Sequence, residues 1–298
     1  MSSIHVICYH RILPVVSNDE RSVDYYHSRR SILHTLSDFR SQLDLIRQKC
    51  DVLDAGEFVA RRRKGLSSRP AVLLTFDDGY SDFDEVVLPE ITARDFPCVL
   101  FPTKAPVVSG FIPPADKVYA ILAAAVSQGT ITASIRESWV SGQAKKAMLH
   151  ASPEDQDAMI NLLMREAGVV SFAEAPPHLT EERLRALPDS VYIGAHGLFH
   201  HEFASLSPAQ LQAELGEILA WVKSIRPRQA AGAWLAYPNG QADRPEKPQA
   251  VTLAVKSAGV DFAFTARGTP IDAGAGDDLL VPRVFSKNGV DWLAEILK

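Results

Sequence analysis

Two adjacent carboxylates at the end of an apolar run are the strongest chemical signal in this chain. The run at residues 72–76 is followed directly by Asp77, Asp78 and Gly79. Burying two neighbouring carboxylates is costly unless a cation or a proton compensates their charge. We therefore predict a metal site here. Taken alone, an Asp-Asp-Gly sequence is more often a simple turn after a strand, so other residues must support the prediction.

Three histidines also follow short apolar runs. Residues 191–195 lead into His196, with His200 four positions further on, and residues 4–9 lead into His10. A His-x-x-x-His spacing is weak evidence by itself, because such a pair can lie on a polar surface. The position of all three histidines after apolar runs matches that of the two carboxylates.

Strands of a parallel sheet are the elements that must position these residues. A fourth apolar run, residues 233–237, ends in Tyr237 and breaks at a Pro-Asn-Gly sequence. Strands that alternate with helices imply parallel pairing and right-handed crossovers. In a parallel α/β barrel, the residues just beyond the carboxyl ends of the strands share one face. We therefore expect the four segments to converge on one site.

Asp78, His196 and His200 together offer one carboxylate and two imidazoles. This ligand set suits Zn²⁺ or another first-row divalent ion, and it leaves coordination positions open, as in catalytic sites. Such an ion acidifies water, and a neighbouring carboxylate can accept the proton. Asp77 is the candidate base. Non-haem Fe(II) oxygenases use the same ligand set and remain an alternative at this point.

Composition limits the class of protein. The chain has 298 residues, 46% of them hydrophobic, and a formal net charge of −5. These values predict one large α/β domain, or one domain that carries an insertion. Nucleic acid is disfavoured as a partner because phosphate neutralisation needs clustered Lys and Arg. The one basic cluster, residues 61–64, suits a helix end, and a lipid-phosphate contact there remains open.

The N-terminus and the cysteines predict a cytoplasmic protein. The apolar run at residues 4–9 is too short for a signal peptide or a membrane span. Cys8, Cys50 and Cys98 are widely spaced and odd in number, which suits a reducing compartment. Cys8 and Cys98 are interpreted as buried, inert thiols. We expect no transmembrane segment, and peripheral contact with the inner membrane surface remains open.

The alternation of strands and helices stops in the middle of the chain. Residues 104–188 resemble a series of helices and are too long for a crossover loop. We interpret them as a helical insertion on the rim of a single domain that spans residues 1–298. Three of their large side chains are interpreted as core residues, namely Tyr119, Trp139 and Met148. The polar segment 15–30 is expected to pass over His10 as a lid or rim.

Residues 75–79, Thr-Phe-Asp-Asp-Gly, resemble the first motif of a known family. They are similar to that motif in the polysaccharide deacetylases of the NodB-homology type, also called carbohydrate esterase family 4. The resemblance implies an α/β fold, a distorted (β/α)7 barrel, which here carries the helical insertion. It also implies that Asp77 is the catalytic base and that Asp78 is a metal ligand.

The second motif of the family supplies two ligand histidines. His196 and His200 resemble them in spacing, and the resemblance implies that both bind the metal. Two positions depart from the usual pattern, because Gly197 replaces a Ser or Thr and His201 replaces a Pro. We expect these departures to affect the bracing of the loop more than ligation.

The third motif usually carries an Arg before a Pro-aromatic pair, whereas this chain has Tyr237 followed by Pro-Asn-Gly. It is similar to a subgroup in which a Tyr-Pro-x-Gly segment takes that place and a later Pro-Arg step faces the site. That residue would be Arg283, for which a surface position is the alternative. Arg283 would orient Asp77 and keep it ionised. The backbone N–H of Tyr237 would help the metal to hold the oxyanion.

The family's C-terminal Leu-x-His motif, the source of its catalytic acid, has no counterpart because no histidine follows His201. His10 resembles the acid of a subgroup in which that residue lies on the first strand, next to the last strand of the barrel. It would protonate the leaving amine, and we expect a neighbouring carboxylate to favour its charged form. If His10 lay outside the site, a catalytically silent sugar-binding or scaffold protein would be the better interpretation.

The resemblance implies a metal-dependent hydrolase of carbohydrate metabolism, such as cell-surface polysaccharide biosynthesis. It would remove an N-acyl group, acetyl or formyl, from an amino sugar in a glycan or in its nucleotide- or lipid-linked precursor. The implied cofactor is one divalent ion, Zn²⁺ first, with Fe, Co, Ni or Mn as alternatives. The implied partner is a carbohydrate, and the oligomeric state is not predicted. An oxygenase is disfavoured because it needs neither Asp77 nor His10.

Overall fold

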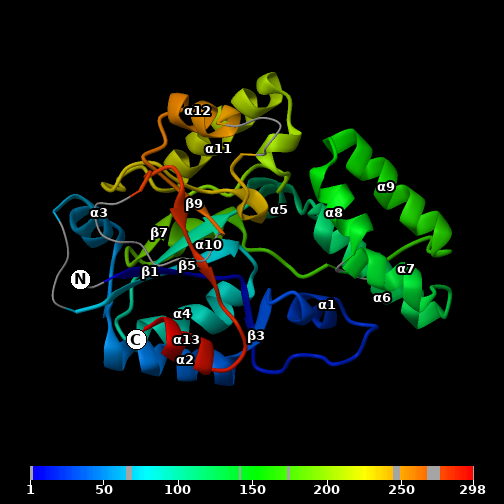
Figure 1. The fold of residues 1–298 in the computed structure, drawn as a ribbon, viewed down its shortest axis with the longest axis horizontal. Coiled ribbons are helices and arrows are strands. Elements are labelled where there is room, and N and C mark those ends of the chain that lie inside the picture. The colour runs from blue at the N-terminus through cyan, green and yellow to red at the C-terminus, as the bar shows by residue number, and fades with distance from the viewer. Residues whose placement is uncertain are drawn as a thin grey trace.

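Parallel strands form the centre of the structure, and helices lie around them (Figure 1). The computed structural model describes residues 3–64, 69–140, 142–172, 175–243, 249–266 and 276–297. The central strands are β1 (Ile4–Tyr9), β5 (Ala71–Asp78), β6 (Cys98–Pro102), β7 (Val191–Ile193), β8 (Trp234–Ala236), β9 (Phe262–Thr265), β10 (Val281–Pro282) and β11 (Val284–Phe285). The short strand β4 (Asp51–Val52) pairs with the start of β5, and β2 (Arg11–Leu13) pairs separately with β3 (Leu33–Thr35).

The strands close into a ring. One sheet has the order β11-β1-β5-β6-β7 and another the order β8-β9-β10, with parallel pairs throughout. A parallel bridge between Ala195 and Leu235 joins β7 to β8. β10 and β11 are halves of one strand interrupted at Arg283, and they pair with β9 and β1 respectively. In the described part of the chain this gives seven strand positions, which confirms the expected barrel and the neighbouring first and last strands.

Helices outside the segment 104–188 cover the barrel. They are α1 (Val23–Arg29), α2 (Leu36–Lys49), α3 (Ala55–Lys64), α4 (Leu88–Thr92), α11 (Pro208–Ile225), α12 (Ala250–Ser257) and α13 (Asp291–Ile296). A π-helical turn, η1 (Phe83–Val87), precedes α4, and short 3₁₀ turns are η2 (Phe203–Ser205) and η3 (Pro238–Gly240). The helices leave the carboxyl ends of the strands free to carry a site.

Alternation along β5 separates two cores and sets the direction of Asp77. Leu74 and Phe76 belong to the core that packs against α2, α4 and α11. Leu73 belongs to the other core, together with aromatic residues of β6, β8 and β9. Because successive strand side chains point to opposite faces, Thr75 and Asp77 follow Leu73 into the barrel. All of β5 is buried, as expected for a parallel strand covered on both faces.

The described residues of 104–188 form helices that stand beside the barrel (Figure 1). They are α5 (Lys104–Ser109), α6 (Pro114–Gln128), α7 (Ala133–Val140), α8 (Gln143–His150), α9 (Pro153–Glu166) and α10 (Glu181–Ala186). α6 to α9 share a hydrophobic core of their own. Tyr119, Trp139 and Met148 all belong to that core, which confirms their interpretation as core residues. The boundaries of the insertion and of the single domain stay predictions.

The segment 15–30 is more ordered than a polar loop. Residues 23–29 form α1, which begins where the Ser22 side chain accepts a hydrogen bond from the Asp24 N–H. The Tyr26 ring stacks on the Tyr119 ring of α6 with 5.7 Å between centroids. The segment therefore packs against α6 as well as lying near His10, which corrects the expectation of a loop alone.

The basic cluster at residues 61–64 lies at the end of α3, as expected for a helix C-terminus. Arg61 forms an ion pair with Asp51 at 2.8 Å, and Arg62 forms one with Asp278. These pairs support a structural role for the two arginines. In the residues that the structure describes, no helix combines the length and the apolar character needed to cross a membrane.

Candidate active site

A cavity of about 530 Å³ lies at the carboxyl ends of the central strands. One wall, which we call the barrel wall, includes His10, Asp77, Asp78, His196 and His200. The other, which we call the helical wall, includes His27 of α1, Asp116 and Tyr119 of α6, and Lys145 of α8. The structure thus brings together residues from three of the four segments that the sequence places at strand ends, and it adds a wall that the sequence did not predict.

Asp78, His196 and His200 form a compact cluster of ligand atoms. The Nε2 atoms of His200 and His196 lie 3.1 Å and 3.4 Å from Asp78 Oδ1, and the three ligand atoms all lie within 4.8 Å of one another. Asp78 Oδ1 is buried and has no hydrogen-bond partner. An unpaired buried carboxylate oxygen is costly, and a cation between these atoms would satisfy it. The three residues therefore fit one divalent ion.

The protonation of His196 suits ligation. Its Nδ1 lies 2.8 Å from the carbonyl oxygen of Ala236, which can only accept a hydrogen bond. Nδ1 therefore carries the proton, and the lone pair of Nε2 faces Asp78. A backbone carbonyl that fixes the outer nitrogen of a ligand histidine is a common feature of metal sites.

His200 and Asp78 form an ion pair in the structure. Burial alone would lower the pKa of His200, but the Asp78 carboxylate outweighs burial and raises it. Burial also opposes the charged form of Asp78, and the two imidazoles nevertheless hold its pKa well below the usual range. A proton on His200 thus balances the carboxylate. A divalent ion at this place would displace the proton, because metal ligands must be deprotonated.

Left-handed backbone conformations bring the ligands to the cavity. Asp78 has a φ of +70° and His200 a φ of +62°, a region that non-glycine residues rarely adopt. The next residue after Asp78, Gly79, has a φ of +81°, and a Cβ there would lie 2.8 Å from Cβ of Pro102. Glycine is therefore required at the end of the first motif, because both the conformation and the available space exclude a side chain.

The departure at Gly197 has a structural explanation. Gly197 has a φ of +86°, and a Cβ there would lie 3.1 Å from Glu214 Oε1. Glu214 of α11 accepts a hydrogen bond from the Leu198 N–H at 2.8 Å and so braces the loop between the two histidines. Burial raises the pKa of Glu214 to about 7. The brace was missed because a Glu on a surface-like helix gives no signal in the sequence.

Arg283 holds Asp77 by both oxygens. Its Nη1 and Nη2 donate to Asp77 Oδ1 and Oδ2 at 2.7 Å and 2.6 Å, and Arg283 is fully buried. Burial alone would raise the pKa of Asp77, but the charge of Arg283 outweighs it and lowers the pKa to about 2. Arg283 thus lies inside the barrel, at the interruption between β10 and β11, and the alternative of a surface position is excluded.

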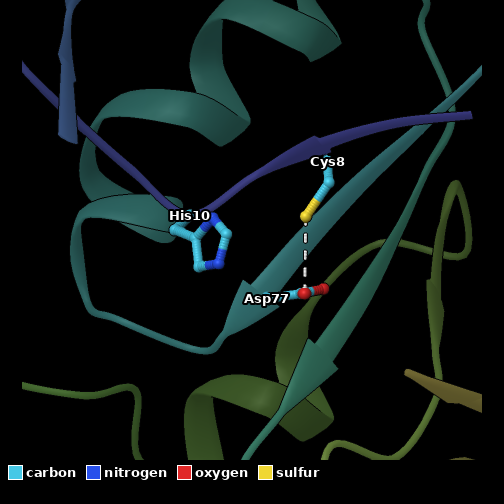
Figure 2. A group of neighbouring side chains, drawn as sticks. All are labelled: Cys8, His10 and Asp77. Carbon is cyan, nitrogen blue, oxygen red and sulfur yellow. Dashed lines mark hydrogen bonds between the residues drawn. The ribbon is translucent and has the colours of Figure 1, made fainter. Parts of the chain in front are cut away.

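His10 lies in the same cluster. One of its ring nitrogens lies within 4.8 Å of an Asp77 carboxylate oxygen and of the Cys8 sulfur (Figure 2). Its ring stacks on Phe285 with 5.4 Å between centroids, and its Nδ1 is buried without a hydrogen-bond partner. Burial lowers the pKa of His10 to about 4, although both carboxylates act to raise it. The expectation that a carboxylate would favour the charged form is therefore wrong, because burial is the larger effect.

Cys8 contacts the candidate base. Its thiol lies 3.4 Å from Asp77 Oδ2 and donates to it (Figure 2). Cys8 is buried, as expected, but its contact with Asp77 was not predicted. The signal was the spacing of Cys8 and His10, because residues two apart on a strand share a face. Cys8, His10 and Asp77 could also hold a cation, but both Asp77 oxygens already accept from the Arg283 cation, so the Asp78 cluster is the better site.

Tyr237 is not placed as expected. Its backbone N–H donates to the carbonyl oxygen of Phe264 at 3.0 Å, as part of the pairing between neighbouring strands. Its hydroxyl donates to the carbonyl oxygen of Leu279 at 3.0 Å. The expectation that the Tyr237 amide faces an oxyanion is corrected, because that amide is already bonded within the sheet.

Asn239, two residues after Tyr237, faces the cavity instead. It has a φ of +56° within the turn η3, and its Nδ2 is buried without a hydrogen-bond partner. An amide N–H₂ group is a donor, and an unpaired buried donor at a cavity suits a ligand oxygen. The Pro-Asn-Gly sequence was the available signal, since Asn adopts left-handed conformations in such turns.

Comparison with known sequences gives one family. The profile described as polysaccharide deacetylase matches residues 64–263 of this chain. The sequence has no significant match among curated proteins. The matched part includes both carboxylates and both histidines of the cluster, whereas His10 and Arg283 lie outside it.

Solved structures with a similar fold are also deacetylases by name. The deacetylase PplD of Streptococcus pyogenes, in complex with acetate, has 13% identity and a TM-score of 0.63, covering 99% of this chain and 98% of its own. IcaB from Ammonifex degensii has 17% identity and a TM-score of 0.61, covering 100% and 97%. A de-N-acetylase from Aggregatibacter actinomycetemcomitans has 14% identity and a TM-score of 0.59, covering 99% and 100%. At these identities the likeness shows the fold alone.

Proposed function

The chain belongs to the polysaccharide deacetylase family, of the NodB-homology type, and from this premise we propose that it is a metal-dependent hydrolase of N-acylated amino sugars. The acyl group is acetyl or formyl, and the sugar lies in a glycan or in a nucleotide- or lipid-linked precursor. One observation carries the proposal: the unpaired Asp78 Oδ1 faces the Nε2 atoms of two histidines beside the Asp77–Arg283 pair.

We assign Asp78, His196 and His200 as the ligands of one divalent ion. Their mixture of one carboxylate and two imidazoles suits Zn²⁺ first, with Fe, Co, Ni or Mn as alternatives. When bound, such an ion acidifies water and polarises the acyl carbonyl group. The protein's part is to hold the ligands in place, through the Ala236 carbonyl behind His196 and the Glu214 brace.

Asp77 is assigned as the general base. It accepts a proton from the attacking water while Arg283 holds both of its oxygens in one orientation. A carboxylate with a pKa of about 2 stays ionised at neutral pH, but it is a weak base. It therefore depends on water that is already acidified, which ties the role of Asp77 to the neighbouring cation site.

His10 is assigned as the group that returns the proton. Amide hydrolysis adds hydroxyl to the acyl carbon, breaks the C–N bond and leaves a proton on the amine nitrogen. With a pKa of about 4, His10 is neutral when substrate binds. It must therefore receive the proton that Asp77 accepts, across a distance of at most 4.8 Å between ligand atoms, and then donate it to the leaving amine.

Asn239 replaces Tyr237 as the proposed donor to the developing oxyanion. Its Nδ2 is unpaired, buried and on the cavity surface, whereas the Tyr237 N–H is bonded to Phe264. A fixed donor that faces the place where negative charge develops stabilises the transition state.

Three further expectations belong to this proposal. A catalytically silent protein was the better interpretation only if His10 lay outside the site, and its position beside Asp77 supports an enzyme. We propose a cytoplasmic location, supported by the buried unpaired thiols of Cys8, Cys50 and Cys98. We also propose that residues 104–188 are an insertion in a single domain, supported by the separate core of α6 to α9.

A substrate panel tests the proposal. Metal-loaded protein is incubated with N-acetylated and N-formylated amino sugars as oligosaccharides, nucleotide sugars and lipid-linked sugars, and released acetate, formate and free amine are measured. We expect equal amounts of acid and amine from one of these classes, and none from Asp77→Asn on the same panel. Protein with a full equivalent of metal that releases no acyl group, or that cleaves only O-acetyl groups, would overturn the proposal.

A further inference from the structure

A buried carboxylate of the helical wall faces the cavity. Asp116 lies in the first turn of α6, is 2% exposed and lines the same cavity as the Asp78 cluster. Its Oδ1 lies 2.8 Å from His27 Nε2, and the Tyr80 hydroxyl lies 3.1 Å from Oδ1 and 3.0 Å from Oδ2. No step of the proposed hydrolysis uses this group.

A chain of hydrogen bonds fixes the protonation of this carboxylate. Arg11 Nη1 lies 3.1 Å from His27 Nδ1, and a guanidinium can only donate, so Nδ1 accepts. His27 Nε2 therefore carries the proton and donates it to Asp116. Arg11 is itself held by Asp24 and Asp82 at 2.6 Å and 2.9 Å. Asp116 thus accepts at the end of a fully oriented network.

Asp116 is held as an ionised acceptor. Burial opposes its charged form, but the hydrogen bond from His27 outweighs burial and keeps the pKa of Asp116 below its usual value. An ionised carboxylate has about four lone-pair sites. Among the described residues, the hydrogen bonds to Asp116 come from two donor groups, His27 and Tyr80. Acceptor capacity is therefore left for a ligand.

The surroundings of Asp116 suit a sugar ring. Tyr80 and Tyr119 line the cavity on either side in sequence of Asp116's partners, and Lys145 of α8 lines it as well and donates to the Tyr119 hydroxyl. The cavity thus offers an acceptor, a donor and two aromatic side chains within one wall. A few fixed polar groups among aromatic side chains are typical of specific small-molecule sites.

We propose that Asp116 forms a subsite that accepts a hydrogen bond from a ring hydroxyl of the sugar substrate. This inference rests on the proposed function and adds to it a substrate-recognition role for the helical wall. A neutral hydroxyl that donates to an ionised carboxylate forms a strong, charge-assisted bond. Asp116 is a specificity residue and not a catalytic one, because it binds a hydroxyl and exchanges no proton with the reacting amide.

The alternative is that Asp116 only anchors α6 to the barrel through His27 and Tyr80. Both roles predict that changing Asp116 lowers activity, so activity alone does not separate them. A hydroxyl-binding role affects one position of the substrate, whereas an anchor affects all substrates alike. Substrates that lack single hydroxyls therefore separate the two.

The experiment compares wild type with Asp116→Asn on the best N-acetylated substrate of the panel and on its monodeoxy analogues. We expect Asp116→Asn to lower kcat/KM about 10- to 100-fold, mostly through KM, because bonds to charged groups are worth about 1.5–3 kcal/mol. One analogue should cost wild type the same factor and Asp116→Asn nothing further. Equal losses on every analogue, or an unchanged KM, would overturn the subsite.

Two further measurements keep the result decisive. Asp116→Glu retains the charge that His27 faces while moving the oxygens, and it should show the same dependence on one hydroxyl if Asp116→Asn does not fold. Calorimetric binding of N-acetylglucosamine oligosaccharides to metal-loaded protein tests the subsite without turnover. Binding that depends on Asp116 without acyl release would remove the proposed function and keep the subsite; normal release with binding independent of Asp116 would do the reverse. Absence of both binding and release would remove both.

Discussion

The barrel wall and the helical wall of the cavity are built in different ways. The barrel wall takes its residues from strand ends, where the parallel register fixes their relative positions. The helical wall takes its residues from α1, α6 and α8, which share a separate core. The barrel wall holds every group that the proposed hydrolysis needs, and the helical wall holds groups that can bind a sugar. We therefore expect changes in the first to affect metal content or kcat, and changes in the second to affect KM.

The largest effect should come from a ligand of the barrel wall. His196→Ala should lose the divalent ion and lower turnover about 10³-fold or more, because a Lewis-acid contribution of several kcal/mol corresponds to that factor. Elemental analysis and kinetics measure both. His201→Ala is the matched control, since His201 lies outside the ligand cluster, and it should keep the metal. Equal metal content in His196→Ala and wild type would remove the ligand assignment.

The second effect separates binding from catalysis within the barrel wall. Asp77→Asn should keep the metal and lower kcat about 10²- to 10⁴-fold, because an amide cannot accept the proton from water. KM should change little if Asp77 acts after substrate binds. Metal analysis and steady-state kinetics on the same preparation measure this, and near-normal turnover in fully metallated Asp77→Asn would contradict the role of base.

The third effect tests His10 at the boundary between the two walls. His10→Ala should keep the metal and lower kcat more than it raises KM, because a proton donor acts in the chemical step. Since the pKa of His10 lies at about 4, its titration should appear on the acid side of the pH profile and not as a loss at alkaline pH. His5→Ala, at the other end of β1, is the control and should keep kcat. A higher KM with unchanged kcat in His10→Ala would assign it to binding.

The smallest effect concerns the brace of the histidine loop. The pKa of Glu214 is about 7 in the folded protein and about 4.3 when unfolded, so its contribution is present below the lower value and is lost as the pH rises through 7. Glu214→Gln should remove this dependence from the free energy of unfolding, by at most about 3 kcal/mol. Urea unfolding of metal-stripped protein at pH 5 and pH 8 measures it. An identical pH dependence in both proteins would show that Glu214 is not the titrating group.

The barrel wall could be predicted because its information is local. The apolar runs fix the strands, and their ends fix where His10, Asp78 and His196 lie once parallel pairing is assumed. Arg283 was placed by family resemblance, and its position at the interruption between β10 and β11 depends on closure of the barrel. Tyr237 failed because its amide pairs with Phe264, which a motif alone does not reveal.

The helical wall could not be predicted because its contacts are distant in sequence. Asp116 is one acidic residue at the start of an Ala-rich helix, and its partners His27 and Tyr80 lie on other elements. The direction of the His10 pKa failed for a related reason. The sequence shows that carboxylates lie near His10, but burial, which proved the larger effect, depends on the packed structure.

Metal titration tests most directly the claim that the barrel wall is the centre of a metal-dependent hydrolase. Protein stripped with a chelator is returned to increasing amounts of Zn²⁺, and acyl release from the best substrate is measured at each step in wild type and His196→Ala. We predict that release by wild type rises linearly to one equivalent of metal per chain and then levels off, while His196→Ala stays flat. Release that is equal with and without metal, or that follows metal equally in both proteins, would contradict the account.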